Sequence, residues 1–313
     1  MTARIAILDD YQNAALTLAD WSVLKDRAAI TVFNDHLEDE AAVIQRLQPF
    51  DIVCVMRERT PLPRSVIAAL PNLRLIVSTG SRNASIDLAA AEACGIAVVN
   101  TGYVSTGVVE LAWALLLALL RHVPEEAASL RAGGWQTRIG GDLAGRTLGL
   151  VGLGRSGAAM ARIALAFGMR VIAWSQNLTP EKAAEHGAQW VEKRALFAGA
   201  DIVSVHMVLS ARTRGLIGAA ELAAMKPDAL LVNTSRGPIV DEAALIAALT
   251  EGRIAGAALD VFDREPLPPD HPFRRLPNCL ATPHVGFVTR ATYTVFYQDT
   301  VKAIDAFLGT PGN

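Results

Sequence analysis

Short apolar runs alternate with stretches of helical spacing over about the first hundred residues of the chain. The helical spacing predicts helices at residues 14–25 and around residues 40–47. The apolar runs predict five β-strands, RIAIL, AITVF, DIVCVM, LRLIVST and GIAVV. Because strands that alternate with helices are typical of parallel βαβ units, this part of the chain is expected to form an α/β domain.

A second series of the same kind begins at residue 146. It predicts six strands, RTLGLV, MRVIAWS, ADIVSVH, ALLVNTS, IAGAALDV and NCLATPH, separated by helical segments. This alternation is typical of a doubly wound parallel sheet. Between the two series, TGYVSTG is a candidate linker, and Thr106 is expected to cap an apolar helix over residues 106–121. Residues 288–308 also have helical spacing and are expected to fold back against the first domain.

The composition narrows the class of protein. With 313 residues, 51% of them hydrophobic, the chain has the material for two cores. Its 29 basic and 31 acidic residues nearly cancel, without a block of like charge, which argues against nucleic acid or a membrane surface as partner. Three widely spaced cysteines indicate neither a disulfide framework nor a metal site, and fit the cytoplasm. The start of the chain lacks a signal-peptide pattern, and the longest nearly apolar run, residues 108–120, is too short to span a bilayer.

A glycine-rich turn follows the strand that opens the second series. The strand TLGLV precedes the pattern GxGxxG, and the helical run AAMARIALAF follows it. Glycines in this context allow a tight turn that brings backbone N–H groups at a helix start against a pyrophosphate. A dinucleotide is therefore expected here, although a glycine turn without a ligand is the structural alternative. The expected contacts are Gly152, Gly154, Arg155, Ser156 and Gly157.

The next strand bears on the choice between NAD and NADP. Dinucleotide sites usually carry an acid at the end of this strand, where it binds the ribose hydroxyls. Here the strand MRVIAW ends in Ser175, Gln176 and Asn177, so a 2′-phosphate is not repelled, yet no arginine directly replaces the acid to attract one. Since hydroxyl and amide groups can bind either ribose, both cofactors remain open, with NADP slightly favoured. Ser175 and Gln176 are expected to contact the ribose.

Three segments with chemically active side chains end strands of the second series: NTSRGPIVDE, ALDVFDREPLP and TPHVGF. Strand ends face the ligand crevice of an open α/β sheet. Arg236, Glu265 and His284 can therefore meet, although 29 and 19 residues separate them. Together with the glycine pattern and the VVEL helix start, these segments resemble the D-isomer-specific 2-hydroxyacid dehydrogenases over nearly the whole chain.

The resemblance implies a fold and a division of the chain. It implies an α/β protein of two doubly wound parallel-sheet domains. A Rossmann dinucleotide-binding domain, residues 102–284, is inserted in a flavodoxin-like substrate domain, residues 1–101 and 285–313. The family likeness also implies a homodimer, and the apolar helix over residues 106–121 suggests a buried subunit contact.

The chemistry explains why these three residue types belong together. Oxidation of a 2-hydroxy acid removes a hydroxyl proton as a hydride leaves, so the site needs a base that titrates near neutrality, such as imidazole. The resemblance assigns this base to His284 and its carboxylate partner to Glu265. It assigns the substrate carboxylate and carbonyl to the guanidinium of Arg236. A core histidine, a solvated loop acid and a surface arginine are the structural alternatives.

Two further residues of the second series receive roles from the resemblance. His206 ends the strand ADIVSVH, where it is interpreted as a cofactor-side or structural residue and not as the base. The family's usual proline, leucine and threonine after this histidine are Val208, Leu209 and Ser210 here. Asp260 ends the strand GAALD and matches the side chain that contacts the nicotinamide amide.

The substrate side is expected in the segment TGSRNASID. The resemblance implies that backbone N–H groups at Gly80 and Ser81 bind the substrate carboxylate. Arg82 stands where the family commonly has a second glycine, which places a large cation beside that site. The hypothesis is that Arg82 or the strand-end Arg57 binds a second anionic group of the substrate; an exposed arginine is the structural alternative.

These observations predict an NAD(P)-dependent oxidoreductase. It would interconvert a 2-oxo acid and a D-2-hydroxy acid, such as glyoxylate, hydroxypyruvate, phosphoglycerate or a bulkier relative. The alternative from another class is a nucleotide-sensing, corepressor-like interaction protein on the same fold. A formate-type dehydrogenase is a third possibility, but family members of that type lack the glutamate partner, so Glu265 argues against it.

Overall fold

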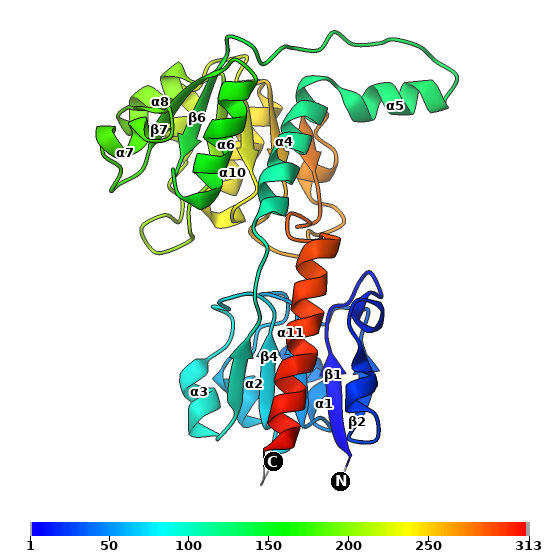
Figure 1. Ribbon diagram of the computed structural model, residues 1–313. Coiled ribbons are helices and arrows are strands. Elements are labelled where there is room, and N and C mark those ends of the chain that lie inside the picture. The colour runs from blue at the N-terminus through cyan, green and yellow to red at the C-terminus, as the bar shows by residue number, and fades with distance from the viewer. Residues whose placement is uncertain (1, 311–313) are drawn as a thin grey trace. The chain divides into compact units, whose positions relative to one another are not determined.

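The computed structural model describes residues 2–310 of the chain (Figure 1). The chain forms two compact units. The first comprises the chain up to Val104 together with the segment from Val288 onward, and the second comprises Ser105–Phe287.

The first unit is built on a parallel sheet that has five strands among residues 2–310, in the order β2-β1-β3-β4-β5. The strands are β1 (Ala3–Ile7), β2 (Ala28–Val32), β3 (Ile52–Val55), β4 (Leu75–Ser78) and β5 (Ala97–Asn100). This is the flavodoxin-like order, and its switch point lies between β1 and β3. The helices are α1 (Glu40–Leu47), α2 (Arg64–Ala68), α3 (Leu88–Ala93) and α11 (Arg290–Gly309).

The C-terminal helix α11 belongs to the first unit, as the spacing of its apolar residues predicted. It buries Tyr293, Phe296, Tyr297 and Ile304. Figure 1 shows it in red along the sheet, where it contacts β4. Helices α1, α2 and α3 pack with the sheet in a separate apolar cluster.

Two local predictions were wrong. The segment predicted as a helix over residues 14–25 forms two short 3₁₀ turns, Ala15–Thr17 and Trp21–Leu24. Asp20 interrupts the helix because it is extended and its carboxylate accepts a hydrogen bond from the Ser22 N–H, which starts a new turn. Thr106 does not cap the apolar helix. It is the first residue of α4 (Thr106–Leu120), which has no side-chain cap.

The second unit is built on a parallel sheet with seven strands in the described chain, in the order β12-β11-β10-β9-β6-β7-β8. The strands are β6 (Thr147–Val151), β7 (Arg170–Trp174), β8 (Gln189–Trp190), β9 (Ile202–Val205), β10 (Leu230–Asn233), β11 (Gly256–Leu259) and β12 (Cys279–Ala281). The sequence missed β8 because two residues are too few for a pattern. The two parallel-sheet α/β domains, one of them a Rossmann domain, confirm the predicted fold class.

Helices cover both faces of this second sheet. They are α4, α6 (Arg155–Ala166), α7 (Pro180–Ala184), α8 (Lys193–Gly199), α9 (Ala219–Ala224) and α10 (Glu242–Thr250). Helix α5 (Val123–Arg131) follows α4, buries none of its residues and projects away from the sheet (Figure 1). The apolar character of α4 is explained by the core of its own unit. Ala112, Trp113 and Leu116 are buried there beside α6. A subunit contact through α4 stays a prediction. Within the described residues, no single helix is long and apolar enough to cross a membrane, although α4 and α5 pass as a pair bent by 62°.

Candidate active site

The glycine-rich turn between β6 and α6 is shaped by contacts that exclude side chains. Gly152 has a φ of +100°, and a Cβ atom there would lie 2.4 Å from the His206 carbonyl oxygen. A Cβ at Gly157 would lie 2.2 Å from the Gly152 carbonyl oxygen. Gly154 caps α6 without a side chain, and the space that its Cβ would take is open to 4 Å. The start of α6 can therefore receive a phosphate against its backbone N–H groups, so these residues fit a dinucleotide.

The other residues predicted to bind the cofactor lie around this turn. Arg155 is exposed and Ser156 is partly buried in the first turn of α6. Ser175 and Gln176 follow β7, which pairs with β6 in parallel. The structure thus brings the sequence-predicted pyrophosphate and ribose residues to the same edge of the sheet.

His206 follows β9 directly. A hydrogen bond of 2.8 Å joins its Nε2 to the Ser204 hydroxyl. Burial lowers the pKa of His206 to about 4, because the charged ring would lose its hydration. The ring is therefore neutral near pH 7 and unsuited to carry a proton there.

His284 and Glu265 form a hydrogen-bonded pair. The distance from His284 Nδ1 to Glu265 Oε2 is 2.5 Å. The other carboxylate oxygen of Glu265 accepts a hydrogen bond of 2.9 Å from the Phe262 backbone N–H. Because the carboxylate occupies Nδ1, Nε2 is the ring nitrogen left to exchange a proton with a ligand.

Asp260 fixes the backbone around His284. It follows β11 and is 1% exposed. Its Oδ1 accepts hydrogen bonds from the Thr282 hydroxyl at 2.6 Å and from the Val285 N–H at 2.8 Å, and its Oδ2 accepts one from the Gly286 N–H at 2.8 Å. Burial raises the pKa of Asp260 while these hydrogen bonds oppose the rise. Its carboxylate thus holds the TPHVGF loop, a role that the sequence did not indicate, and its contact with the nicotinamide amide stays a prediction.

Arg236 follows β10, at the same sheet edge. Its Nη1 donates a hydrogen bond of 2.8 Å to the Ser235 carbonyl oxygen. A Cβ at the next residue, Gly237, would lie 2.1 Å from the carbonyl carbon of Phe262. The Arg236 loop therefore packs directly on the backbone that leads to Glu265. Since β10, β11 and β12 are neighbours, the sheet brings the three predicted catalytic residues to adjacent strand ends.

In the first unit, the backbone of the predicted substrate loop is tied to the segment after β5. The Gly80 N–H donates a hydrogen bond of 2.8 Å to the Thr101 hydroxyl. Binding of a substrate carboxylate by Gly80 and Ser81 stays a prediction. Ser81 and Arg82 are exposed. Arg57 lies against Gly80, where a Cβ would be only 1.8 Å from its Nη1, and its guanidinium stands 5.3 Å from the Tyr103 ring.

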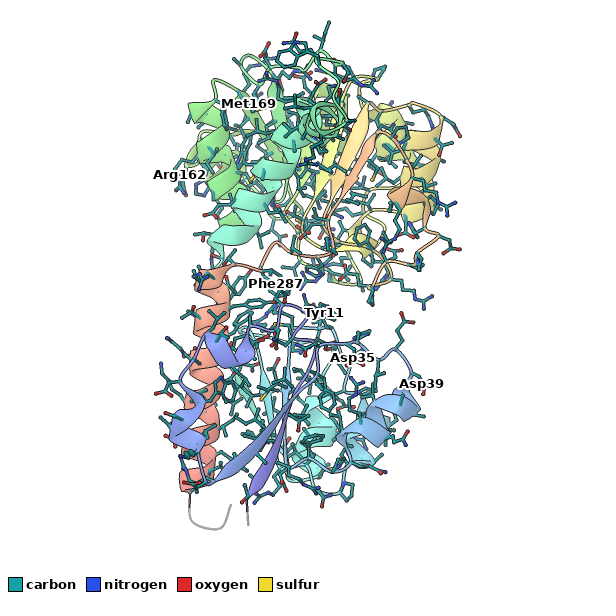
Figure 2. All side chains as sticks on the ribbon, turned by 90° about the vertical axis from the view of Figure 1, so that its right-hand side faces the viewer. Tyr11, Asp35, Asp39, Arg162, Met169 and Phe287 are labelled. Atoms are coloured by element: carbon teal, nitrogen blue, oxygen red, sulfur yellow. The ribbon has the colours of Figure 1, made fainter. Side chains whose placement is uncertain are left out.

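The structure adds two residues here that the sequence analysis missed. The Arg59 guanidinium lies 4.5 Å from the ring centre of Tyr11, which follows β1 and is labelled in Figure 2. Arg59 Nη1 also donates a hydrogen bond of 3.0 Å to the Asp9 carbonyl oxygen. The sequence contained no signal for Arg59, because Arg57 and Arg59 lie in the turn after β3, where the alternation of a strand does not apply. The turn after β3 thus carries Arg59 as well as Arg57.

Comparison with known proteins assigns the chain to one enzyme family. The family model described as D-isomer specific 2-hydroxyacid dehydrogenase, NAD binding domain, matches residues 113–286. Glyoxylate reductase of Korarchaeum cryptofilum is 37% identical over 87% of this chain and 86% of its own. D-3-phosphoglycerate dehydrogenase of Methanocaldococcus jannaschii is 39% identical over 90% of this chain, which spans only 55% of that relative. The crystal structure of a phosphoglycerate oxidoreductase from Vibrio cholerae has a TM-score of 0.93 at 39% identity, covering 98% of this chain and 99% of its own.

Proposed function

Because the chain belongs to the D-isomer-specific 2-hydroxyacid dehydrogenase family, we propose that it interconverts a small 2-oxo acid and its D-2-hydroxy acid with His284 as the proton carrier. An NAD-dependent oxidoreductase acting on hydroxy and oxo acids follows from the family and from its relatives. The observation that carries the finer proposal is the hydrogen bond between His284 and Glu265.

The side chains divide the chemistry among them. His284 donates a proton from Nε2 to the carbonyl oxygen of the 2-oxo acid, and it takes the hydroxyl proton in the opposite direction. Glu265 holds the other ring nitrogen and stabilises the imidazolium. Arg236 binds the substrate carboxylate and polarises the carbonyl. When bound, the dinucleotide supplies or accepts the hydride.

The cofactor would be held by the residues around the start of α6. The glycines accept the pyrophosphate because their backbone can approach it closely, and Ser175 and Gln176 hydrogen-bond the ribose. Neither side chain repels a 2′-phosphate, which supports use of NADPH as well as NADH, with NADPH slightly favoured. Comparison of kcat/KM for the two cofactors measures this preference. A preference for NADH of several hundredfold would contradict it.

The proposed function is tested with a panel of 2-oxo acids that includes glyoxylate, hydroxypyruvate and phosphohydroxypyruvate. Loss of NADH or NADPH absorbance reports turnover, and the chirality of the product reports the D-isomer. Turnover of at least one acid is expected. Tight cofactor binding without turnover of any member would contradict the proposal and favour the corepressor-like alternative.

The arginines of the first unit support a substrate with a second anionic group. Arg57 and Arg59 follow β3, and Arg82 is exposed beyond β4. A carboxylate or phosphate on the substrate would be attracted by this positive charge. The substitutions Arg57→Ala and Arg82→Ala should each lower kcat/KM more for a doubly charged acid than for glyoxylate. Equal kcat/KM ratios for the two acids would exclude both arginines.

A homodimer is supported by exposed apolar side chains on α5 and the segment after it. Val123, Leu130, Trp135 and Ile139 are all exposed, the last two by 73% and 96%. Large apolar groups gathered on one segment are typical of an interaction surface. Light scattering should give twice the chain mass for the wild-type protein and the chain mass for Trp135→Asp/Ile139→Asp. A wild-type monomer at micromolar concentration would contradict the dimer.

A further inference from the structure

We propose that Glu242 is a positioning residue for the acid-base pair, because its carboxylate ties together both ends of the loop that carries Glu265. The proposal rests on the proposed roles of Glu265 and His284. Glu242 is the first residue of α10, directly after Asp241, whose Oδ1 caps the helix by accepting a hydrogen bond from the Ala244 N–H. The carboxylate therefore projects from a helix start that is itself fixed.

Glu242 reaches the loop at two places. Its Oε2 accepts a hydrogen bond of 3.3 Å from the Asp263 N–H, at the start of the loop. Its Oε1 lies 3.1 Å from Nε2 of His271, at the end of the loop. The Phe273 N–H donates a hydrogen bond to Nδ1 of His271, so the proton is on Nε2 and the ring donates to Glu242. One carboxylate thus closes residues 263–271 into a loop of fixed ends.

The hydrogen bond from the Asp263 N–H to Glu242 lies next to the hydrogen bond from the Phe262 N–H that positions Glu265. Glu265 accepts a hydrogen bond from the Phe262 N–H, and Glu242 accepts one from the N–H of the next residue. Two carboxylates therefore hold consecutive backbone N–H groups. On its other side this backbone lies against Gly237, where a Cβ would be 2.6 Å from the Asp263 nitrogen. The backbone is held between α10 and the Arg236 loop, so loss of Glu242 releases it on one side only.

Aromatic packing fixes the far end of the loop. Phe262 and Phe273 are buried, with ring centres 6.2 Å apart, and the His271 ring lies 5.0 Å from that of Phe273. His271 therefore joins Glu242 to the same apolar cluster that anchors Phe262. A displacement at Glu242 is transmitted to both ends of the loop.

The carboxylates of Glu242 and Asp263 lie close together and repel each other, so the favourable contribution of Glu242 comes from its hydrogen bonds. Burial raises the pKa of Asp263, and the nearby carboxylate of Glu242 raises it further. Asp241 acts in the same direction, while Arg214 and His271 oppose it. The negative charge of Glu242 beside the partly buried carboxylate of Asp263 is unfavourable. The hydrogen bonds of Glu242 to the Asp263 N–H and to His271 offset this repulsion.

The test is a double-mutant cycle on turnover. Glu242→Ala should lower kcat by roughly 10- to 100-fold, the size expected when a catalytic group is slightly misplaced. The dissociation constant for NADH, measured by fluorescence, should stay within about twofold of the wild-type value. The proposed cofactor contacts lie at the start of α6, whereas Glu242 lies on α10. If Glu242 acts through Glu265, its substitution should have almost no further effect on kcat in a Glu265→Ala background, whereas an independent structural role would multiply the two losses.

Control variants keep the test decisive if Glu242→Ala folds poorly. Glu251→Ala removes an exposed carboxylate from the other end of α10 and should leave kcat unchanged. His271→Ala removes one of the two links and should give a smaller loss than Glu242→Ala, again absent in the Glu265→Ala background. Normal kcat in both Glu242→Ala and His271→Ala, with a large loss in Glu265→Ala, would overturn the inference alone. Normal kcat in Glu265→Ala would overturn the proposed function instead.

Discussion

Two histidines follow strands of the same parallel sheet, β9 and β12, which β10 and β11 separate, and the two rings have different partners. His206 follows β9 and is joined to the hydroxyl of Ser204, and burial lowers its pKa to about 4. His284 follows β12, is joined to the carboxylate of Glu265, and keeps a 27% exposed side chain. A hydroxyl does not stabilise an imidazolium, whereas a carboxylate does.

A strand-end position does not by itself distinguish the histidine that we propose as proton carrier from the other one. Both rings lie at the edge where an open α/β sheet binds ligands. What separates them is the acid partner and access to solvent. The sequence contained the acid in the segment DREP, 19 residues before His284, but only the loop conformation brings it within hydrogen-bond distance.

Substitution of each histidine in turn is the strongest test of the different roles proposed for His284 and His206. His284→Ala should lower kcat by roughly 10²- to 10⁴-fold, because general acid-base catalysis is worth that much. His206→Asn should lower it far less, since a neutral ring supplies no proton. Steady-state kinetics on one oxo acid, with NADH binding followed by fluorescence, measures both. Equal losses in the two variants, or a greater loss in His206→Asn, would contradict the assignment.

Removal of the negative charge of Glu265 tests whether this charge, and not only the position of the ring, sets His284 apart from His206. Glu265→Gln keeps the shape and an oxygen that can accept from the Phe262 N–H, but it cannot stabilise the imidazolium. A fall in kcat of up to about 10⁴-fold is expected, since the amide N–H group then faces Nδ1 and favours the wrong tautomer, and stabilisation of the charge is lost. If the partner only orients the ring, this variant would keep near-normal kcat.

The fold class was predictable because buried parallel strands are nearly continuous apolar runs. All four residues of β3, β4, β9 and β10 are buried, and each of these strands was predicted from its apolar run. The helix predicted over residues 14–25 failed because one side chain, Asp20, started a new turn, an effect that periodicity does not contain. The two-residue strand β8 was too short for any pattern.

The residues of the candidate site whose side chains would carry the chemistry could be predicted from the sequence. The contacts that involve backbone groups could not. Arg236, Glu265 and His284 stand in recognisable segments at strand ends. The N–H of Phe262 and the carboxylate of Glu242 left no signal, because a contact between backbone and side chain depends on the loop conformation. The hydrogen bond from the Gly80 N–H to the Thr101 hydroxyl left no signal for the same reason.

The smallest expected effect concerns stability and tests the neutral state of His206. Unfolded histidine takes up a proton near pH 6.5, whereas folded His206 does so only near pH 4. Between these values the unfolded state binds more protons, so the free energy of unfolding falls as the pH falls. For this group the fall from pH 6.5 to 5.5 is about 1 kcal/mol. Urea unfolding of the wild-type protein and of His206→Gln at both pH values measures it. The variant should lack this increment, and an identical pH dependence in the two proteins would mean that His206 titrates normally and that the contrast with His284 fails.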